Sequence, residues 1–212
     1  MTMTASITHC WKSGQLERLL RHCLGWLVLL LFAGLAHAQS ADITQFRAER
    51  AEEEIQVSAQ IQFELPAAVE DALLKGIPMY FVAEADVLRE RWYWYDKRLA
   101  SVERHMRLAY QPLTRRWRLN VSTGPGNANS QGLVLNQGFD TLPQALAGIK
   151  RVSGWKVADV ADLDPSLKYK VEFRFRLDLS RLPRPFQIGA IGQSDWDVSA
   201  GISTPLSSDL TK

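Results

Sequence analysis

In Leu167-Lys-Tyr-Lys-Val-Glu-Phe-Arg-Phe-Arg-Leu-Asp-Leu179, every second residue is apolar and each residue between is charged. Successive side chains of a strand point to opposite faces of a sheet, so this stretch predicts a long strand with one buried and one wet face. A second stretch, Ile55 to Leu65, has the same pattern. Its apolar side holds Ile55, Val57, Ala59, Ile61, Phe63 and Leu65. Strands with one wet face favour antiparallel sheets.

Weaker alternation predicts six further strands. They are Met79 to Leu88, Arg104 to Tyr110, Arg115 to Val121, Gln131 to Asn136, Trp155 to Val160 and Asp195 to Ile202. Gln111-Pro-Leu-Thr114 is a predicted hairpin turn between two of them. Many short strands with few helices predict a mostly β protein, an antiparallel β-sandwich of immunoglobulin-like architecture.

One or two short helices are expected to interrupt the strands. Pro66 can begin the first, and Gly76 can end it. The second is predicted from Leu142 to Ile149, with Thr141 as its N-cap and an apolar stripe along one side.

The first residues have the parts of a cleavable secretory signal peptide. Cations precede an apolar run from Cys23 to Leu35, and the small-residue triplet Ala36-His-Ala38 follows it. We expect cleavage between Ala38 and Gln39, which leaves a single domain, 39–212, with a flexible tail from about 204. The alternative is an uncleaved anchor, but a spanning helix needs about 20 apolar residues, and this run is shorter. No stable membrane span is expected after cleavage.

Cleavage would also change which chemistries are open to the chain. Both cysteines and every histidine except His105 lie before Gln39, so thiol chemistry and multi-histidine zinc sites are not expected in the domain. Without Lys12, Arg18, Arg21 and Glu17, basic and acidic residues are equal in number. A neutral domain argues against nucleic acid as a partner. No cofactor or metal is predicted.

Three other groups of residues were candidates for a site. A Ser-His-acid triad would have to use His105, which the alternation places on a wet strand face. Asp195 and Asp197 can form a carboxylate pair of the kind that cleaves glycans, although such acids are commonly just a wet face. Asp159, Asp162 and Asp164 lack the glycine and the closing glutamate of a calcium loop. We therefore predict no catalytic residue.

Two loops or surfaces remain for binding. The segment 124–132 is rich in glycine but has neither the lysine nor the following helix of a phosphate-binding loop, so we expect a flexible connector. Outward-facing cations on two predicted strands would make a basic surface for an anionic lipid or an acidic partner if those strands were neighbours. These cations are Arg116, Arg118, Lys168, Lys170, Arg174 and Arg176.

The least ordinary feature is Arg91-Trp-Tyr-Trp-Tyr-Asp-Lys97. An extended chain would place the tryptophans and the tyrosines on opposite faces. We expect Trp92 and Trp94 in the core because tryptophan brings the larger apolar area. The other face then forms a candidate binding surface of aromatic and cationic groups. It consists of Arg91, Tyr93, Tyr95 and Lys97.

These segments, taken in order, resemble a family of exported proteobacterial proteins catalogued as domain of unknown function 4390 (DUF4390), often labelled "proline-rich signal peptide protein". The resemblance rests on four segments. They are Leu65 to Pro78, Arg91 to Asp96, Arg115 to Arg118 and the strand that ends at Leu179. It implies export and, through gene neighbourhood, an association with a sensor kinase. It supplies no catalytic residues.

Together these observations predict a non-enzymatic binding or interaction domain in the periplasm of a Gram-negative bacterium. Its partner would be an envelope protein or a glycan, and envelope sensing is one possible context. The alternative is a cell-envelope enzyme that acts on glycan through a carboxylate pair. A cleft with converging carboxylates would favour the enzyme, and exposed aromatics on an open surface would favour the binding domain.

Overall fold

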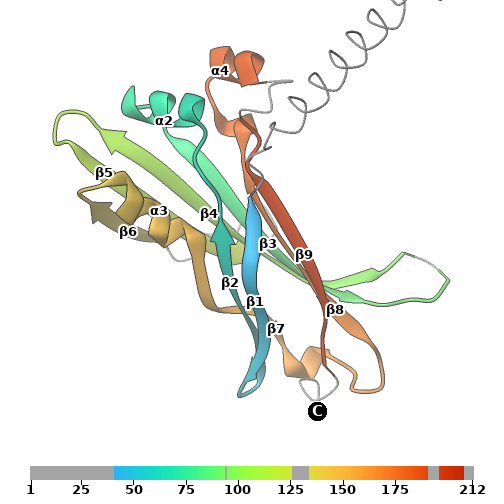
Figure 1. The fold of residues 1–212 in the computed structure, drawn as a ribbon. Helices are drawn as coiled ribbons and strands as arrows, with labels where there is room; N and C mark the ends of the chain where they lie inside the picture. Colours follow the sequence, from blue (N-terminus) through green and yellow to red (C-terminus); the bar gives the residue numbers. More distant parts are fainter. Residues whose placement is uncertain (1–40, 94, 126–133, 191–195, 208–212) are drawn as a thin grey trace, which may run out of the picture. The chain divides into compact units, whose positions relative to one another are not determined.

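The computed structural model describes residues 41–93, 95–125, 134–190 and 196–207 of the 212-residue chain. All of them belong to one compact unit, Gln39–Lys212. Within these residues, nine strands form two antiparallel sheets connected by turns and short helices (Figure 1). The predicted signal peptide lies outside the described residues.

The two sheets differ in size. The smaller sheet has the order β1-β2-β7, from Asp42–Ala51, Glu54–Gln62 and Arg151–Asp159. The larger sheet has the order β6-β5-β4-β3-β8-β9, from Val134–Phe139, Arg116–Pro125, Lys97–Gln111, Met79–Arg89, Tyr169–Leu177 and Ser199–Pro205. The mostly β, antiparallel sandwich is confirmed. Its likeness to immunoglobulin domains lies in the architecture, because the strand order differs.

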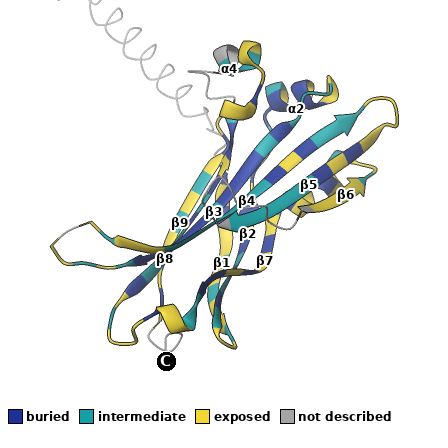
Figure 2. Cartoon of the chain, turned by 180° about the vertical axis from the view of Figure 1, so that it is seen from behind, coloured by how far each residue is buried: buried dark blue, intermediate teal, exposed yellow. Residues whose placement is uncertain are grey.

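The core lies between the sheets, where phenylalanine rings meet. Phe46 of β1 lies 5.8 Å from Phe173 of β8, measured between ring centroids. Phe63, just after β2, lies 5.4 Å from Phe175 and 5.8 Å from Phe81. The predicted inward faces of β2 and β8 are the buried ones, and burial alternates along these strands (Figure 2).

Short helices complete the domain. The two predicted helices are α2 (Ala67–Leu74) and α3 (Leu142–Lys150), and α4 (Arg184–Ala190) was not predicted. Single 3-10 turns form η1 (Val160–Asp162) and η2 (Leu179–Arg181). Among the described residues, no helix combines the length and the hydropathy that crossing a bilayer requires.

The ends of α2 and the position of α3 follow from local chemistry. Helix α2 ends at Leu74 and is followed by Gly76, whose φ of +84° suits glycine and whose amide donates to the Leu73 carbonyl at 2.8 Å. Helix α3 covers the inner face of the larger sheet beside β5 and β6. Gly148 of α3 lies close to this sheet, because a Cβ added to Gly148 would be only 3.1 Å from the Leu119 side chain.

Several predicted strand ends differ from the observed ones. Thr204 and Pro205, where a tail was expected to begin, pair with β8, and Leu206 is buried, with its amide donating to the Tyr169 carbonyl at 2.8 Å; residues 208–212 lie outside the described residues. The last strand begins at Ser199 and not at Asp195. Strand β1 was not predicted at all.

The ring cluster gives a direct test of the core. Phe81 is completely buried, so Phe81→Ala should lower the free energy of unfolding by about 3–5 kcal/mol, as for other buried aromatics. Leu113 is fully exposed in the β4–β5 turn, and Leu113→Ala should stay within about 0.5 kcal/mol of the natural protein. Denaturant unfolding of both variants measures this difference, and equal losses would contradict the described core.

Candidate functional site

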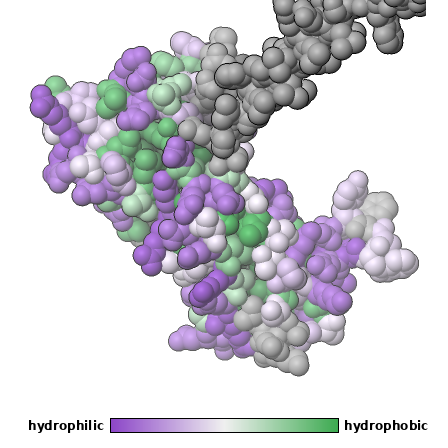
Figure 3. All heavy atoms as spheres, in the orientation of Figure 1, coloured by the Kyte–Doolittle hydropathy of each residue, from purple (hydrophilic) through white to green (hydrophobic). Residues whose placement is uncertain are grey.

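The first candidate site is the connection between β3 and β4. The last pair of this hairpin is Arg89 and Lys97, so the chain between them leaves the sheet. We call residues 91–97 the aromatic tip; the structure describes all of it except Trp94. Figure 1 shows the tip projecting beyond the other strands, and Figure 3 shows pale colours of intermediate hydropathy toward the end of this projection and purple, hydrophilic atoms at its base.

The described aromatic side chains of the tip are in water. Trp92 is 93% exposed, Tyr95 86% and Tyr93 69%. The prediction of a buried Trp92 is therefore wrong, and Trp94 lies outside the described residues. The reason is that the chain here is a loop and not a strand, so alternation does not send one pair of side chains into the core. The predicted exposure of both tyrosines is confirmed.

The base of the tip is fixed to the larger sheet. The backbone amide of Arg91 donates to Asp96 Oδ1 at 3.2 Å. Lys170 of β8 binds the other carboxylate oxygen of Asp96 at 2.7 Å. The amide of Glu90 donates to the Lys168 carbonyl at 3.0 Å. The loop is thus held at both ends while its aromatic rings stay outside.

The electrostatics of the tip follow from these contacts. The hydrogen bond from Lys170, with that from the Arg91 amide, holds the pKa of Asp96 below its ordinary value of 3.8. The same bond raises the pKa of Lys170. Arg91 is half-buried and Lys97 exposed, and neither makes an ion pair with the described residues. The tip therefore offers aromatic area with cationic neighbours, as predicted for Arg91, Tyr93, Tyr95 and Lys97.

The outer face of the larger sheet is highly charged. At its centre Asp86 of β3 is 1% exposed, with Arg174 at 2.7 Å and Arg98 at 3.2 Å from its Oδ2. Both arginines also bind or approach Glu84. These two arginines neutralise a buried carboxylate, so little of their charge is available to a partner outside the sheet.

The predicted basic surface does not form. Strands β5 and β8 are separated by β4 and β3, so the two sets of cations are not neighbours. Most of these cations also have acidic partners. Arg116 binds Asp140 at 2.9 Å, Lys170 binds Asp96, and Arg176 lies 3.9 Å from Asp178.

His105 lies on the outer face, as predicted. Its Nε2 lies 3.1 Å from Glu103, and Ser122 is opposite it on β5, which places the three residue types of a triad on one surface. However, the buried Nδ1 of His105 has no hydrogen-bond partner among the described residues. The serine is therefore not engaged as a nucleophile would be.

The other predicted candidates do not gather into a site. Asp195 lies outside the described residues, and Asp197 accepts the Ser199 hydroxyl at 2.9 Å. Asp164 accepts the hydroxyl and the amide of Ser166, which is ordinary turn chemistry. Most of the glycine-rich segment, 126–132, also lies outside the described residues.

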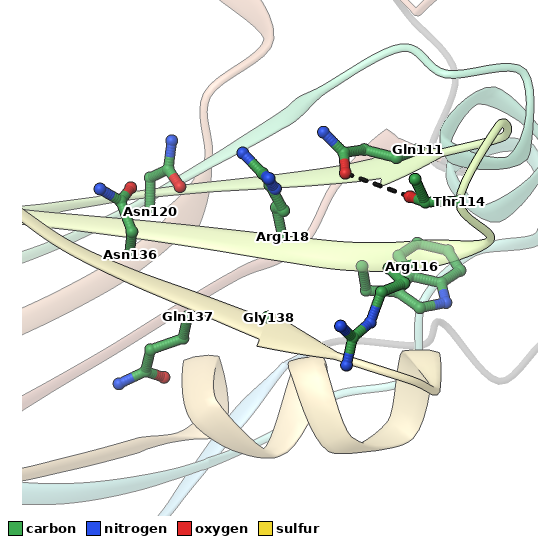
Figure 4. A pocket seen from close by; sticks show the side chains of 9 residues that line it. Gln111, Thr114, Arg116, Arg118, Asn120, Asn136, Gln137 and Gly138 are labelled. Carbon is green, nitrogen blue, oxygen red and sulfur yellow. Dashed lines mark hydrogen bonds between the residues drawn. The ribbon is translucent and has the colours of Figure 1, made fainter.

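A second candidate site was missed by the sequence analysis. It is a groove of about 520 Å³ on the outer face, where β4, β5 and β6 run side by side. We call it the polar groove, and its main lining residues are Gln111, Arg116, Arg118, Asn120, Asn136 and Gly138. Figure 4 shows Gln111, Arg118, Asn120 and Asn136 on the same side of the three strands. The sequence analysis named only Arg116 and Arg118, as members of the predicted basic surface, because the strand register that brings the other residues to them is not visible in one sequence.

The buried carboxylate on the outer face predicts an asymmetric response to mutation. Arg98→Ala with Arg174→Ala leaves the Asp86 charge buried without a partner, which should cost about 3–5 kcal/mol. Asp86→Asn should cost less, about 1–3 kcal/mol, because the two arginines are half-exposed and can turn to water. Urea unfolding measures both. Arg107→Ala with Arg176→Ala, on the same face, should cost about 0.5 kcal/mol. The opposite order would show that Asp86 is not the centre of the cluster.

The tip predicts a pH dependence. Because its pKa is lowered in the folded state, Asp96 stabilises the tip above pH 3.8, and this contribution is lost as the pH falls through the lowered pKa. Carbon-13 NMR should find the midpoint of Asp96 titration below 3.8, and Lys170→Met should raise it. Arg176→Met, on the same face of β8, should leave it unchanged. A midpoint that ignores Lys170→Met would contradict the described ion pair.

Comparison with known proteins adds one result. No curated protein and no solved structure matches the chain. The model of the family described as domain of unknown function (DUF4390) matches residues 38–204, which includes the aromatic tip, the polar groove and both sheets except the last residue of β9. The chain therefore belongs to the DUF4390 family.

Proposed function

We propose that the chain is an exported, non-enzymatic binding or interaction domain of the Gram-negative periplasm, and that the aromatic tip is its contact with a partner. One observation carries the proposal: Trp92, Tyr93 and Tyr95 stand in water at the end of one hairpin. Burying a large apolar side chain is worth about 1.5–3 kcal/mol. These side chains are not buried in the folded chain, so burying them against a partner could stabilise a complex.

Two further features support a contact surface at the tip. The contacts of Asp96 and Glu90 hold the loop, so binding orders fewer groups than it would with a free loop. Arg91 and Lys97 flank the rings, and exposed aromatic groups with arginine are enriched at binding hot spots.

The partner we propose is an envelope protein or a glycan. Aromatic faces pack against peptide side chains and against the apolar faces of sugar rings. A sensor protein of the envelope is one partner of this kind, in keeping with the association that the family resemblance implied. Export and signal cleavage after Ala38 are part of the same proposal.

Crosslinking in cells tests the tip. A photoreactive residue at Lys97 should capture a discrete partner, while the same residue at the fully exposed Leu113 should not. Trp92→Ala with Tyr93→Ala and Tyr95→Ala should remove the captured species. Each of these changes should alter the free energy of unfolding by only about 0.5 kcal/mol, because the three side chains are largely exposed.

Two results would count against the proposal. The first is capture of the same species from positions 97 and 113. The second is capture that persists in the triple variant while its melting temperature is unchanged. N-terminal sequencing of this chain, recovered from the same cells, tests export, which predicts Gln39 as its first residue.

A further inference from the structure

Gly138 of β6 is a glycine that neither the backbone nor the packing requires. Its φ is not among the positive values of the described glycines, which are those of Gly76 and Gly154. A Cβ added at Gly138 would have nothing within 4 Å. The pairing of β5 with β6 runs through it without a bulge. Glycine weakens a strand, and it often marks a place where a ligand approaches the backbone.

The open space over Gly138 lies beside Arg118. The two residues are directly opposite in the β5–β6 pairing, and on the other side Arg118 is opposite Ala109 of β4. Directly opposite residues of antiparallel strands share a face, so Arg118 stands between two residues with almost no side chain. Arg118 is exposed.

The positive charge of Arg118 is not paired with any residue that the structure describes. Arg118 makes no hydrogen bond or ion pair with any of those residues, whereas Arg116, two residues earlier, binds Asp140 through both Nε and a terminal nitrogen. Figure 4 shows the Arg116 side chain turned away from that of Arg118. A free planar guanidinium in a recess is suited to bind a carboxylate or phosphate through two parallel hydrogen bonds.

Amide groups lie on both sides of this cation. Asn120 and Asn136 are directly opposite each other, two residues along the strands. On the other side, the oxygen of Gln111 accepts the Thr114 hydroxyl at 3.3 Å, so its amide nitrogen remains a donor. Side-chain amides both donate and accept, which is what recognition of hydroxyl groups requires.

We propose that the polar groove binds an acidic saccharide, with its anionic group on Arg118 and its hydroxyls on the flanking amides. The volume of about 520 Å³ lies within the range of small-molecule sites. Because the lining is polar and open, the affinity for one sugar unit should be weak, with a Kd on the order of 1 mM. The site is separate from the aromatic tip, which lies at the opposite end of β4.

Amide chemical shifts in a nitrogen-15 NMR titration test this proposal on the protein as purified from cells. The probes are glucuronate, glucose 6-phosphate, glucose and acetate. Glucuronate or glucose 6-phosphate should shift the amides of Arg118, Asn120 and Asn136 in a saturable way. Glucose and acetate should each bind at least about tenfold more weakly, because each lacks half of the recognised groups. Whichever acid binds more tightly identifies the anion as carboxylate or phosphate.

Two variants separate a built site from general charge attraction. Arg118→Ala should weaken binding of the acidic sugar at least about tenfold, while Arg176→Ala, on the same face, should not. Gly138→Leu keeps every charge but fills the space beside Arg118, and it should also weaken binding at least about tenfold. Acetate that binds as well as glucuronate, or binding that survives Gly138→Leu, would overturn the proposal. So would the absence of saturable shifts with both acids.

Discussion

Strand β3 is buried on both of its faces, and the arrangement of the domain depends on this. Its inward side chains, such as Phe81, pack in the ring cluster between the sheets. Its outward face carries Asp86, which is covered by arginines that reach across from β4 and β8. A buried carboxylate needs such partners, and the observed register of the three strands supplies them. The same register determines which residues meet elsewhere on the outer face.

Strand β4 connects the central strands to two separate surfaces. It is the longest strand, Lys97–Gln111, and it begins at the aromatic tip and ends at the polar groove. Strand β4 pairs with β3 from Lys97 to Leu108, and its other end, at Gln111, pairs with β5, so both ends are held in the larger sheet. Function on such a scaffold is expected at the ends of the strands, where loops and edge strands are free of packing demands.

The sequence predicted what alternation can show. The buried faces of β2 and β8 and the helix between Pro66 and Gly76 are as expected, because each depends on neighbours within one segment. Trp92 was misplaced because alternation was extended through a turn that has no glycine or proline to mark it. Strand β1 was missed because Asp42–Ala51 is mostly polar. The polar groove depends on pairing between strands, which one sequence does not reveal.

Charge separates the residues that build the fold from those available for binding. Arg98 and Arg174 surround Asp86, and their removal would harm folding before any contact was lost. Arg118, Arg91 and Lys97 make no ion pair with the described residues, so keeping them there brings no stability through pairing. The first pair reaches inward to Asp86 on the central strand β3, whereas Arg118 lies in the polar groove and Arg91 and Lys97 lie in the aromatic tip. A domain whose basic and acidic residues are equal in number can therefore still present local cationic sites, because Arg91, Arg118 and Lys97 have no acidic partner among the described residues.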